Sequence, residues 1–374
     1  MTGPRPVRIF VSAGEPSGDL HGAGVVTALR ERFPGAVIDA FGGPAMAGAG
    51  ARVLYSMEAY SAMGFVEVIH SIPAHLRLLR TLGRRFRDEP YDLVLPIDYP
   101  GFHMRLAARA HQAGTRVLYY IPPALWAWRP GRARRLKVVD RLAVILPFEP
   151  EAFGRLGLSA EFVGHPLVDG EAEAPGRPQA RSALGIPAED RVLAIFPGSR
   201  SLEVKNHWPL FRDAAGVLRA EGRCERVIAA ATPAGAYPDA GDITLVRDDP
   251  VVVLRAADAV LAKSGTTTLQ AALADTPMVV AYRTHPWTSV IARRLLRVRW
   301  ISLVNLVAEA GVVPELLQED VTVDRLVREL RPLLDPADPV TVEQRRGLAL
   351  VRERMGPPGA ARRVAAMAGE LIGR

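Results

Sequence analysis

Short apolar runs alternate with stretches of helical periodicity along the first half of the chain. Residues 18–33, 73–87 and 102–113 carry apolar positions at helical spacing. Between them lie apolar runs that predict strands, namely RIFVSAGE, VIDAFGG, DLVLPID, RVLYYIPP, RLAVILPFE and AEFVGHP. Because these runs are apolar almost throughout, both faces of the sheet are expected to be covered. The pattern predicts an α/β unit with a parallel sheet and helices on both sides.

The alternation stops at DGEAEAPGRPQ, residues 169–179, where Pro, Gly and Glu indicate an interdomain linker. It then restarts with the predicted strands RVLAIFPGSR, ERVIAAATP, DITLVRDD, AADAVLAKSGT and PMVVAYR. We therefore predict two doubly wound α/β domains, residues 1–168 and 180–345. Ligands of such sheets bind beyond the C-terminal ends of the strands, and two such domains facing each other would form a cleft.

Composition excludes several classes of protein. The length of 374 residues fits about two domains. Cys224 is the only cysteine, so neither an internal disulfide nor a cysteine-based zinc site can form. No apolar run reaches the roughly 18 residues of a spanning helix, and MTGPRPVRIF does not read as a signal peptide. We expect a protein that is not integral to a membrane.

Positive charge is concentrated in the first half, where residues 1–168 hold 20 Lys and Arg against 14 Asp and Glu. Part of it follows a predicted amphipathic helix, in which arginines lie one position after apolar residues. A helix of this kind can rest on an anionic membrane. It can equally pack on its own sheet with a solvated basic edge, and the spacing leaves both interpretations open. The candidate membrane residues are Val66, Val68, Ile69, Ile72, Leu76 and Leu79, with Arg77 and Arg80.

Two strand-to-helix turns in the second half have the composition of anion-binding sites. Gly198, Ser199 and Arg200 follow one strand, and the SGT turn of residues 264–266 follows another. Backbone N–H groups at a helix N-terminus, together with a guanidinium, suit a diphosphate. The alternative is that both turns only cap their helices. Neither GxxxxGK(S/T) nor GxGxxG after a strand is present, which argues against ATP-hydrolysing and NAD-binding folds.

Acidic side chains follow strand ends in the first half. Asp98 ends DLVLPID, and Glu15 and Asp19 lie in the turn after RIFVSA. Clustered carboxylates raise one another's pKa, which suits a general base. In the competing interpretation, Asp19 caps the helix that starts near residue 20 and Asp98 caps the one near 101. We favour the cap for Asp19 and the catalytic role for Asp98.

The loop YYIPPALWAWRPGRARRLK places Trp126 and Trp128 beside Arg129 and further basic residues. Indole faces suit sugar rings or a lipid–water boundary, and the basic cluster suits anionic groups. A nucleic-acid interface is the competing interpretation, but no recognised binding module accompanies it. The eight histidines show no metal-ligand spacing, so no metal is assigned, and His165 in FVGHP is expected to face the cleft.

Together these segments resemble the lipid-A-disaccharide synthases, glycosyltransferase family 19. The resemblance runs in order over about residues 7–318 and is carried by AGEPSGD, FGGPAM, AMGFVEV, IDYPGFH, PPALWAWRPGR, LPFE, FVGHP, PGSRSLEV, SGTTTLQ, YR and SLVNL. It implies a GT-B fold and an inverting glycosyltransferase of lipid A biosynthesis that needs no metal or other cofactor. The implied substrates are UDP-2,3-diacylglucosamine and 2,3-diacylglucosamine 1-phosphate (lipid X). The implied location is peripheral, on the cytoplasmic face of the Gram-negative inner membrane.

The resemblance also gives roles to the candidate residues. Asp98 would be the general base, with Glu15 beside it as a second catalytic residue. The implied UDP-binding residues are Gly198, Ser199, Arg200, Glu203, Ser264, Gly265, Thr266, Gln270, Tyr282, Arg283 and Asn305. The implied acceptor and sugar contacts are Ser17, Asp19, Met63, Trp126, Trp128, Arg129 and His165. A C-terminal helix at about residues 346–374 would pack back onto the first domain, as in many GT-B chains.

The chain departs from the family pattern in two places. Gln270 stands where family members commonly have Glu, which removes a charge from an expected ribose contact, and Val304 replaces a common Pro. Two alternatives to the synthase remain: a UDP-sugar 2-epimerase on the same fold, and a non-catalytic protein that binds a nucleotide sugar or anionic lipid. Both leave part of the pattern without a role. Nucleic acid is not an expected partner, and acyl-chain length and oligomeric state, a homodimer included, stay open.

Overall fold

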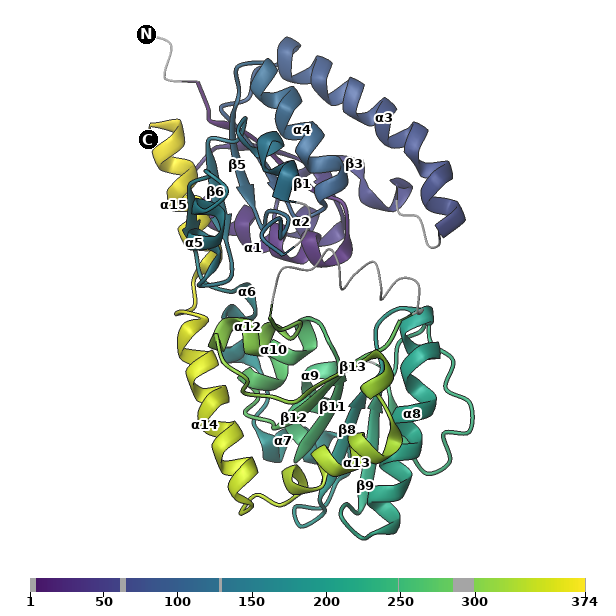
Figure 1. Ribbon diagram of the computed structural model, residues 1–374. Coiled ribbons are helices and arrows are strands. Elements are labelled where there is room, and N and C mark those ends of the chain that lie inside the picture. The colour runs from purple at the N-terminus through teal and green to yellow at the C-terminus, as the bar shows by residue number, and fades with distance from the viewer. Residues whose placement is uncertain (1–4, 61–64, 128–129, 248, 285–298, 374) are drawn as a thin grey trace. The chain divides into compact units, whose positions relative to one another are not determined.

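The structure, a computed structural model, describes residues 5–60, 65–127, 130–247, 249–284 and 299–373, without the side chains of residues 65–71 (Figure 1). The chain divides into two compact units. One comprises the residues up to Asp169 together with those from Pro357 onward, and the other comprises Gly170–Gly356. The predicted linker of residues 169–179 is largely part of the second unit, because α7 (Arg177–Ala183) already begins within it and packs on α9 (Pro250–Ala256).

The first unit is built on a parallel sheet of seven strands in the order β3-β2-β1-β4-β5-β6-β7. The strands are β1 (Arg8–Ala13), β2 (Val37–Gly42), β3 (Arg52–Ser56), β4 (Leu93–Ile97), β5 (Arg116–Tyr120), β6 (Arg141–Val144) and β7 (Ala160–Phe162). The order reverses between β1 and β4, which pair with Ala13 opposite Ile97. The turns after these two strands therefore lie side by side at the switch point, where such sheets bind ligands.

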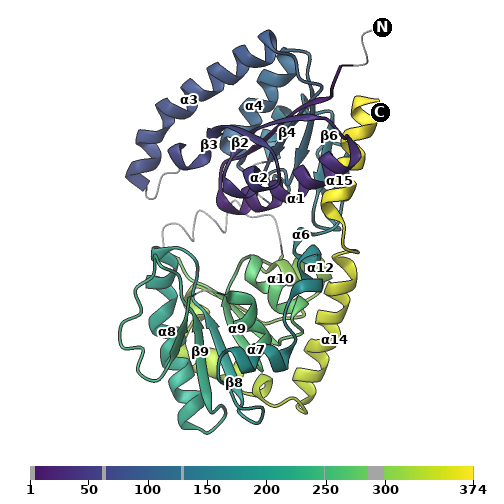
Figure 2. The ribbon, with the colours of Figure 1, turned by 180° about the vertical axis from the view of Figure 1, so that it is seen from behind.

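Alternate residues of β1 enter two different cores. Ile9 and Val11 pack with α1 (Pro16–Arg32) and α15 (Ala360–Ile372) on one face of the sheet. Phe10 packs with α3 (Phe65–Asp88) and α4 (Pro100–Gln112) on the other face. Figures 1 and 2 show these helix pairs on opposite sides of the strands. The two-residue period explains why the strands are apolar almost throughout, as the sequence predicted.

The second unit repeats this arrangement with six parallel strands in the order β10-β9-β8-β11-β12-β13. The strands are β8 (Val192–Phe196), β9 (Arg226–Ala230), β10 (Thr244–Val246), β11 (Ala259–Lys263), β12 (Met278–Tyr282) and β13 (Glu315–Leu317). Further α-helices in the described part of this unit are α8 (Ser201–Ala220), α10 (Thr266–Leu273), α12 (Leu303–Ala308), α13 (Val323–Leu330) and α14 (Pro339–Arg354). Its switch point lies between β8 and β11, so the PGSR and SGT turns are neighbours.

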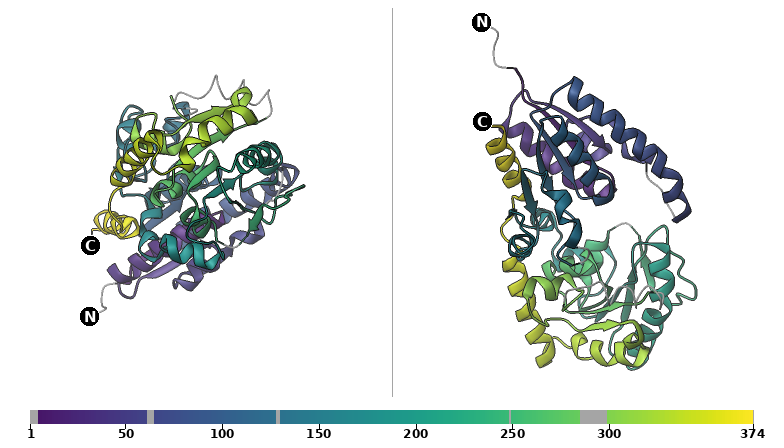
Figure 3. Two further views of the ribbon diagram at one scale, coloured as in Figure 1. Left: turned by 90° about the horizontal axis from the view of Figure 1, so that it is seen from below. Right: turned by 45° about the horizontal axis from the view of Figure 1, so that its top comes forward.

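The C-terminal segment is two helices rather than the single helix predicted for about residues 346–374. α14 belongs to the second unit, and only α15 packs on the first unit, where it contacts α1 (Figure 3). Gly356 and Gly359 adopt positive φ angles of 79° and 100°, which break the helix where the chain passes between units. The Asp169 carboxylate accepts hydrogen bonds from the backbone N–H groups of Gly359 and Ala360, which fixes the start of α15.

Candidate active site

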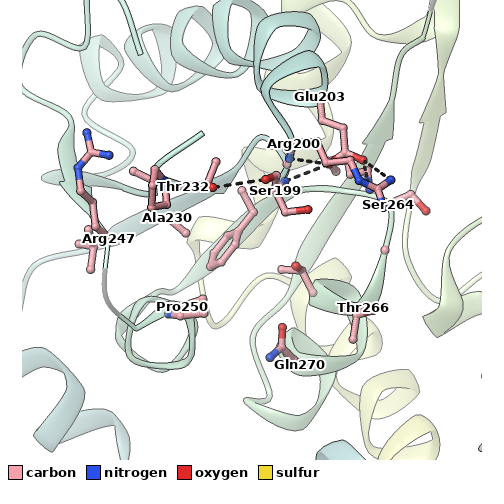
Figure 4. A pocket seen from close by; sticks show the side chains of 18 residues that line it. Ser199, Arg200, Glu203, Ala230, Thr232, Arg247, Pro250, Ser264, Thr266 and Gln270 are labelled. Carbon is pink, nitrogen blue, oxygen red and sulfur yellow. Dashed lines mark hydrogen bonds and ion pairs between the residues drawn. The ribbon is translucent and has the colours of Figure 1, made fainter. Parts of the chain in front are cut away.

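A pocket of about 500 Å³ lies at the switch point of the second unit (Figure 4). This volume is within the usual range for small-molecule sites. Eight of the predicted UDP-binding residues line it: Gly198, Ser199, Arg200, Glu203, Ser264, Gly265, Thr266 and Gln270. The sequence therefore identified both turns of the pocket, because each turn comes after a strand adjoining the point where the strand order reverses.

The turn before α8 is stabilised by an internal carboxylate. Oε2 of Glu203 accepts hydrogen bonds from the backbone N–H groups of Ser199, at 3.0 Å, and Arg200, at 3.4 Å. Gly198 makes this possible: its φ is 134°, and a Cβ there would lie 2.4 Å from Cβ of Glu203. Two of the N–H groups predicted to bind diphosphate are thus paired within the protein, as the cap interpretation expects.

The turn before α10 is different. Gly265 is the N-cap residue, and no side chain caps this helix. Ser264 donates its hydroxyl to the carbonyl of Ile301 at 3.0 Å, which holds the turn in place. Thr266 in the first turn is exposed and lines the pocket. The partial positive charge of this helix end therefore faces the pocket without a side-chain acceptor.

Sequence reasoning missed several residues of this pocket. Lys263, Thr232, Arg247 and Pro250 line it. Lys263 and Arg247 add positive charge, and Thr232 donates its hydroxyl to the carbonyl of Ser199 at 3.4 Å. Lys263 could have been found from its position as the last residue of an apolar strand, directly before SGT. Thr232 and Arg247 come after two other strands, and only the strand order brings them here.

Three of the predicted UDP contacts do not line the pocket. Tyr282 and Arg283 lie at the end of β12, where the backbone N–H of Arg283 donates to Nε2 of His207 at 2.9 Å. The prediction for Asn305 is wrong as a side-chain contact, because this residue is buried within its own unit. Its amide nitrogen donates to the Val313 carbonyl and to Glu315, and its amide oxygen accepts from the N–H groups of Val312 and Val313. The full set of partners makes it a structural residue.

Asp98 lies in the first unit in an unusual turn after β4. Its φ is 52° and that of Tyr99 is 47°, a left-handed conformation that costs non-glycine residues free energy. Two side chains hold this turn through the carbonyl oxygen of Asp98. His103 Nδ1 donates to it at 2.7 Å, and the Tyr119 hydroxyl donates at 2.8 Å.

The tautomer of His103 can be deduced from these contacts. A carbonyl only accepts, so Nδ1 carries the proton, and Nε2 accepts from the Ser12 hydroxyl at 2.8 Å. Burial lowers the pKa of His103 to about 4, against smaller opposing effects of hydrogen bonds to the Asp98 and Ile97 backbone. The imidazole is therefore neutral at pH 7 and serves as a fixed donor to the turn.

Burial of the Asp98 carboxyl raises its pKa, and the charge of Glu15 raises it further, against a smaller opposite effect of the Tyr99 N–H. Asp98 does not cap α4, whose N-cap residue is Tyr99 without a side-chain cap. Glu15 and Ser17 are both exposed at the start of α1. The acidic pair predicted from the strand ends is thus brought together, and Asp98 is a stronger base than an ordinary aspartate.

Two predicted acceptor contacts are corrected by the structure. Asp19 is buried, and its carboxylate accepts from the N–H groups of Gly43, Ala45 and Met46. It therefore fixes the start of α2 (Pro44–Gly48) instead of contacting a sugar or capping α1. His165 is also buried, and its Nδ1 accepts from the N–H of Leu167. Burial, with the neighbouring charge of His21, lowers the pKa of His165 to about 4.

Trp126 is held by its indole nitrogen, which donates to Oε1 of Glu149 at 3.1 Å. Its ring packs edge-on against Phe148 at 4.8 Å between centroids. Burial raises the pKa of Glu149 to about 7, although hydrogen bonds from the Leu146 N–H, Trp126 and the Ile145 N–H oppose the shift. Trp126 thus anchors its own loop. Met63, Trp128 and Arg129 lie outside the described residues.

Some residues of the predicted membrane surface are exposed. Ile72 is 48% exposed and Leu76 39%, and Arg77 and Arg80 are exposed beside them. Leu79 is only 5% exposed and packs in the core of α3 and α4, so its assignment to the surface is wrong. The side chains of Val66, Val68 and Ile69 lie outside the described part of the structure.

Two kinds of feature are absent from the described residues. Among them, no helix has the length and apolar character that crossing a membrane requires. In the same part of the chain, no three His, Cys, Asp or Glu side chains are grouped as metal ligands would be.

Solved structures place this architecture in a known class. The glycosyltransferase of kitacinnamycin covers 98% of this chain and 100% of its own, with a TM-score of 0.62 at 17% identity. A putative UDP-N-acetylglucosamine 2-epimerase of Listeria monocytogenes covers 98% of this chain and 97% of its own, with a TM-score of 0.68 at 13% identity. At these identities the likeness concerns the fold alone. Two Rossmann-like units of this kind define the GT-B class.

The sequence comparison is more specific. The sequence model of the lipid-A-disaccharide synthetase family matches residues 9–354. The lipid-A-disaccharide synthase of Geobacter sulfurreducens is 39% identical over 381 residues, which cover 98% of each chain. The chain belongs to the lipid-A-disaccharide synthase family and is a glycosyltransferase of lipid A biosynthesis.

Proposed function

We propose that the protein transfers the sugar of UDP-2,3-diacylglucosamine to the 6-hydroxyl of lipid X with inversion. The 6-oxygen attacks the anomeric carbon, the bond from that carbon to the UDP oxygen breaks, and the electron pair leaves with UDP. Asp98 takes the hydroxyl proton. The products are the β-1,6-linked disaccharide 1-phosphate and UDP. One displacement from the opposite side gives the β configuration without a covalent intermediate.

The observation that carries this proposal is the environment of Asp98. Its carboxyl lies at the switch point of the first unit, next to Glu15, with its pKa raised by burial and by that charge. A base with a raised pKa takes a proton more readily in the transition state. His103 and Tyr119 hold its backbone, so the carboxyl is positioned before substrate arrives.

The donor would bind in the pocket of the second unit. The uncapped N-terminus of α10 and the guanidinium groups of Arg200 and Arg247 supply positive charge for a diphosphate. Gln270 offers a neutral hydrogen-bonding group to the ribose. We expect these groups to stabilise the leaving UDP without a metal ion. Turnover that survives an excess of EDTA supports this, and loss restored by a divalent cation contradicts it.

The proposed location is the cytoplasmic face of the inner membrane, bound peripherally. The exposed Ile72 and Leu76, with Arg77 and Arg80 alongside, combine apolar contact with attraction to anionic lipid. Both proposed substrates carry acyl chains and reside in that membrane, so docking would bring the enzyme to them.

The reaction is tested by incubating the purified protein with UDP-2,3-diacylglucosamine and lipid X in detergent micelles. Mass spectrometry monitors UDP and the disaccharide, and the proton coupling of the new anomeric centre reports its configuration. Equal amounts of UDP and β-disaccharide are expected. UDP without disaccharide would indicate hydrolysis or another acceptor, and an α-linkage would exclude inversion. An unconsumed donor with folded protein would contradict the proposed substrates.

A further inference from the structure

The pocket of the second unit contains an ion pair to which the proposed reaction gives no role. Nζ of Lys263 lies 3.0 Å from Oε1 of Glu203, and their side chains are 19% and 17% exposed. Lys263 is the last residue of β11, and Glu203 lies in the first turn of α8. The pair therefore joins the two turns that form the pocket.

Glu203 contacts the groups that an incoming phosphate would need. Its carboxylate takes two backbone N–H groups at the start of α8 and the Lys263 ammonium, and the Arg200 guanidinium lies 4.0 Å away. Burial would raise the pKa of Glu203, but the hydrogen bond and charge of Lys263, with the two N–H groups, hold it below its ordinary value. The carboxylate is thus ionised at neutral pH and stands in for a bound anion.

Lys263 has an alternative position for its charge. It immediately precedes the turn of α10, whose N-terminus has no side-chain cap, and its ammonium also lies 5.9 Å from the centre of the Tyr282 ring. A flexible side chain there can turn from Glu203 toward an anion at α10. Glu203 is held more firmly, because two backbone N–H groups bind it in addition to Lys263.

We propose that the Glu203 carboxylate competes with the donor diphosphate for one positive group, the Lys263 ammonium. Lys263 leaves Glu203 and pairs with the diphosphate at the N-terminus of α10, where it neutralises the leaving group. Glu203 opposes binding, since its charge repels the phosphates and occupies the α8 N–H groups. This proposal rests on the proposed function for the choice of UDP as the ligand.

The test is calorimetric titration of UDP into the wild-type protein and four variants. Lys263→Met should weaken UDP binding about 10- to 100-fold, the usual effect of losing one charge-assisted hydrogen bond. Lys263→Arg should restore most of the affinity. Glu203→Gln should tighten binding by about fivefold or more, because it removes a like charge and keeps an acceptor for the N–H groups. Lys205→Met, which removes the same charge from an exposed position on α8, should change nothing.

Binding of uridine, which has no phosphate, should be unaffected in every variant. Weakening of UDP binding by both Glu203→Gln and Lys263→Met would show that the pair is only a structural cap, and an unchanged affinity in Lys263→Met would overturn the proposal as well. Disaccharide formation by the wild-type protein is measured in parallel. Normal turnover with unshifted UDP affinities rejects this inference alone, whereas the expected shifts without disaccharide reject only the proposed reaction.

Discussion

Asp98 depends on its backbone as much as on its side chain. The left-handed conformation of Asp98 and Tyr99 persists because His103 and Tyr119 both donate to one carbonyl oxygen. Gly14 contributes by allowing the Tyr99 ring to approach, since a Cβ there would lie 2.3 Å from a ring carbon. At the residue scale, the position of the candidate base therefore depends on side-chain and backbone contacts from several segments.

Replacing Asp98 by Asn should lower kcat by about 100- to 10,000-fold, the usual contribution of a general base. The affinity for UDP should stay the same, because Asp98 belongs to the other unit of the chain. Asp88→Asn, at an exposed position in the same unit, is the matched control. Single-turnover rates and UDP titrations are the measurements, and near-normal turnover in Asp98→Asn would assign the base elsewhere.

The pH dependence of the wild-type enzyme should reflect the same group. The base works only when deprotonated, so kcat/KM should fall as the pH drops through the pKa of Asp98. Because burial and Glu15 raise that pKa, the fall should begin at a higher pH than for an ordinary aspartate. Glu15→Gln removes the second cause and should move the acidic limb to lower pH. If the acidic limb does not move in Glu15→Gln, the charge of Glu15 does not affect the pKa of the catalytic base.

His103 is a positioning residue, because it contacts the Asp98 backbone and is fully buried. His103→Ala should lower kcat about tenfold or more while KM and the UDP affinity change little, the loss expected for a misplaced catalytic group. His103→Asn keeps a donor near the position of Nδ1 and should recover much of the rate. Equal losses in both variants, or a loss confined to thermal stability, would reduce His103 to a packing role.

At the scale of elements, apolar runs predicted the central strands well, since strands buried on both faces have few polar positions, such as Ser12 of β1 and Asp39 of β2. β3 and β13, both at sheet edges, were not among the predicted strands, because their residues are partly exposed and do not form an extended apolar run. The start of α3 was placed near residue 73, although the helix begins at Phe65 and contains Pro73 in its interior.

The exposed apolar residues of α3 carry the element-scale prediction. Changing both Ile72 and Leu76 to Ser should reduce co-sedimentation with phosphatidylglycerol vesicles by about tenfold or more, because each exposed side chain contributes apolar area to membrane contact. The double change Val340→Ser and Val342→Ser, at exposed positions of α14, is the control. Equal binding of both double variants would favour the alternative, in which the basic edge of α3 is only solvated.

At the scale of the whole molecule, the C-terminal helix α15 contributes to the core of the first unit. Val364, Met367 and Ala368 of α15 are buried with Ile9 and Val11 of β1. The first unit is therefore assembled from both ends of the sequence, and the second unit is formed by one continuous segment.

Met367→Ala should destabilise the first unit by about 2–4 kcal/mol, the usual cost of truncating a buried side chain of this size. Hydrogen exchange of the β1 and β4 peptides should accelerate, while peptides of β8 and β11 keep their protection. Leu350→Ala, at an exposed position of α14, should stay within about 0.5 kcal/mol. Uniform acceleration in both units would show that they unfold together.

The sequence by itself determined the two α/β units, the strand-end positions of Asp98, PGSR and SGT, and the family. These features are local, because apolar runs define buried strands and short motifs identify the turn after each strand.

The tertiary structure decided which polar groups remain available to a ligand. The sequence predicted Asp19, Asn305 and Glu203 as site residues. The side chains of the first two are hydrogen-bonded to backbone N–H and carbonyl groups of other segments. Glu203 lines the pocket with its carboxylate already paired to Lys263 of a neighbouring strand. Hydrogen-bond partners between distant segments depend on the order of strands in the sheet, and a single sequence does not specify that order.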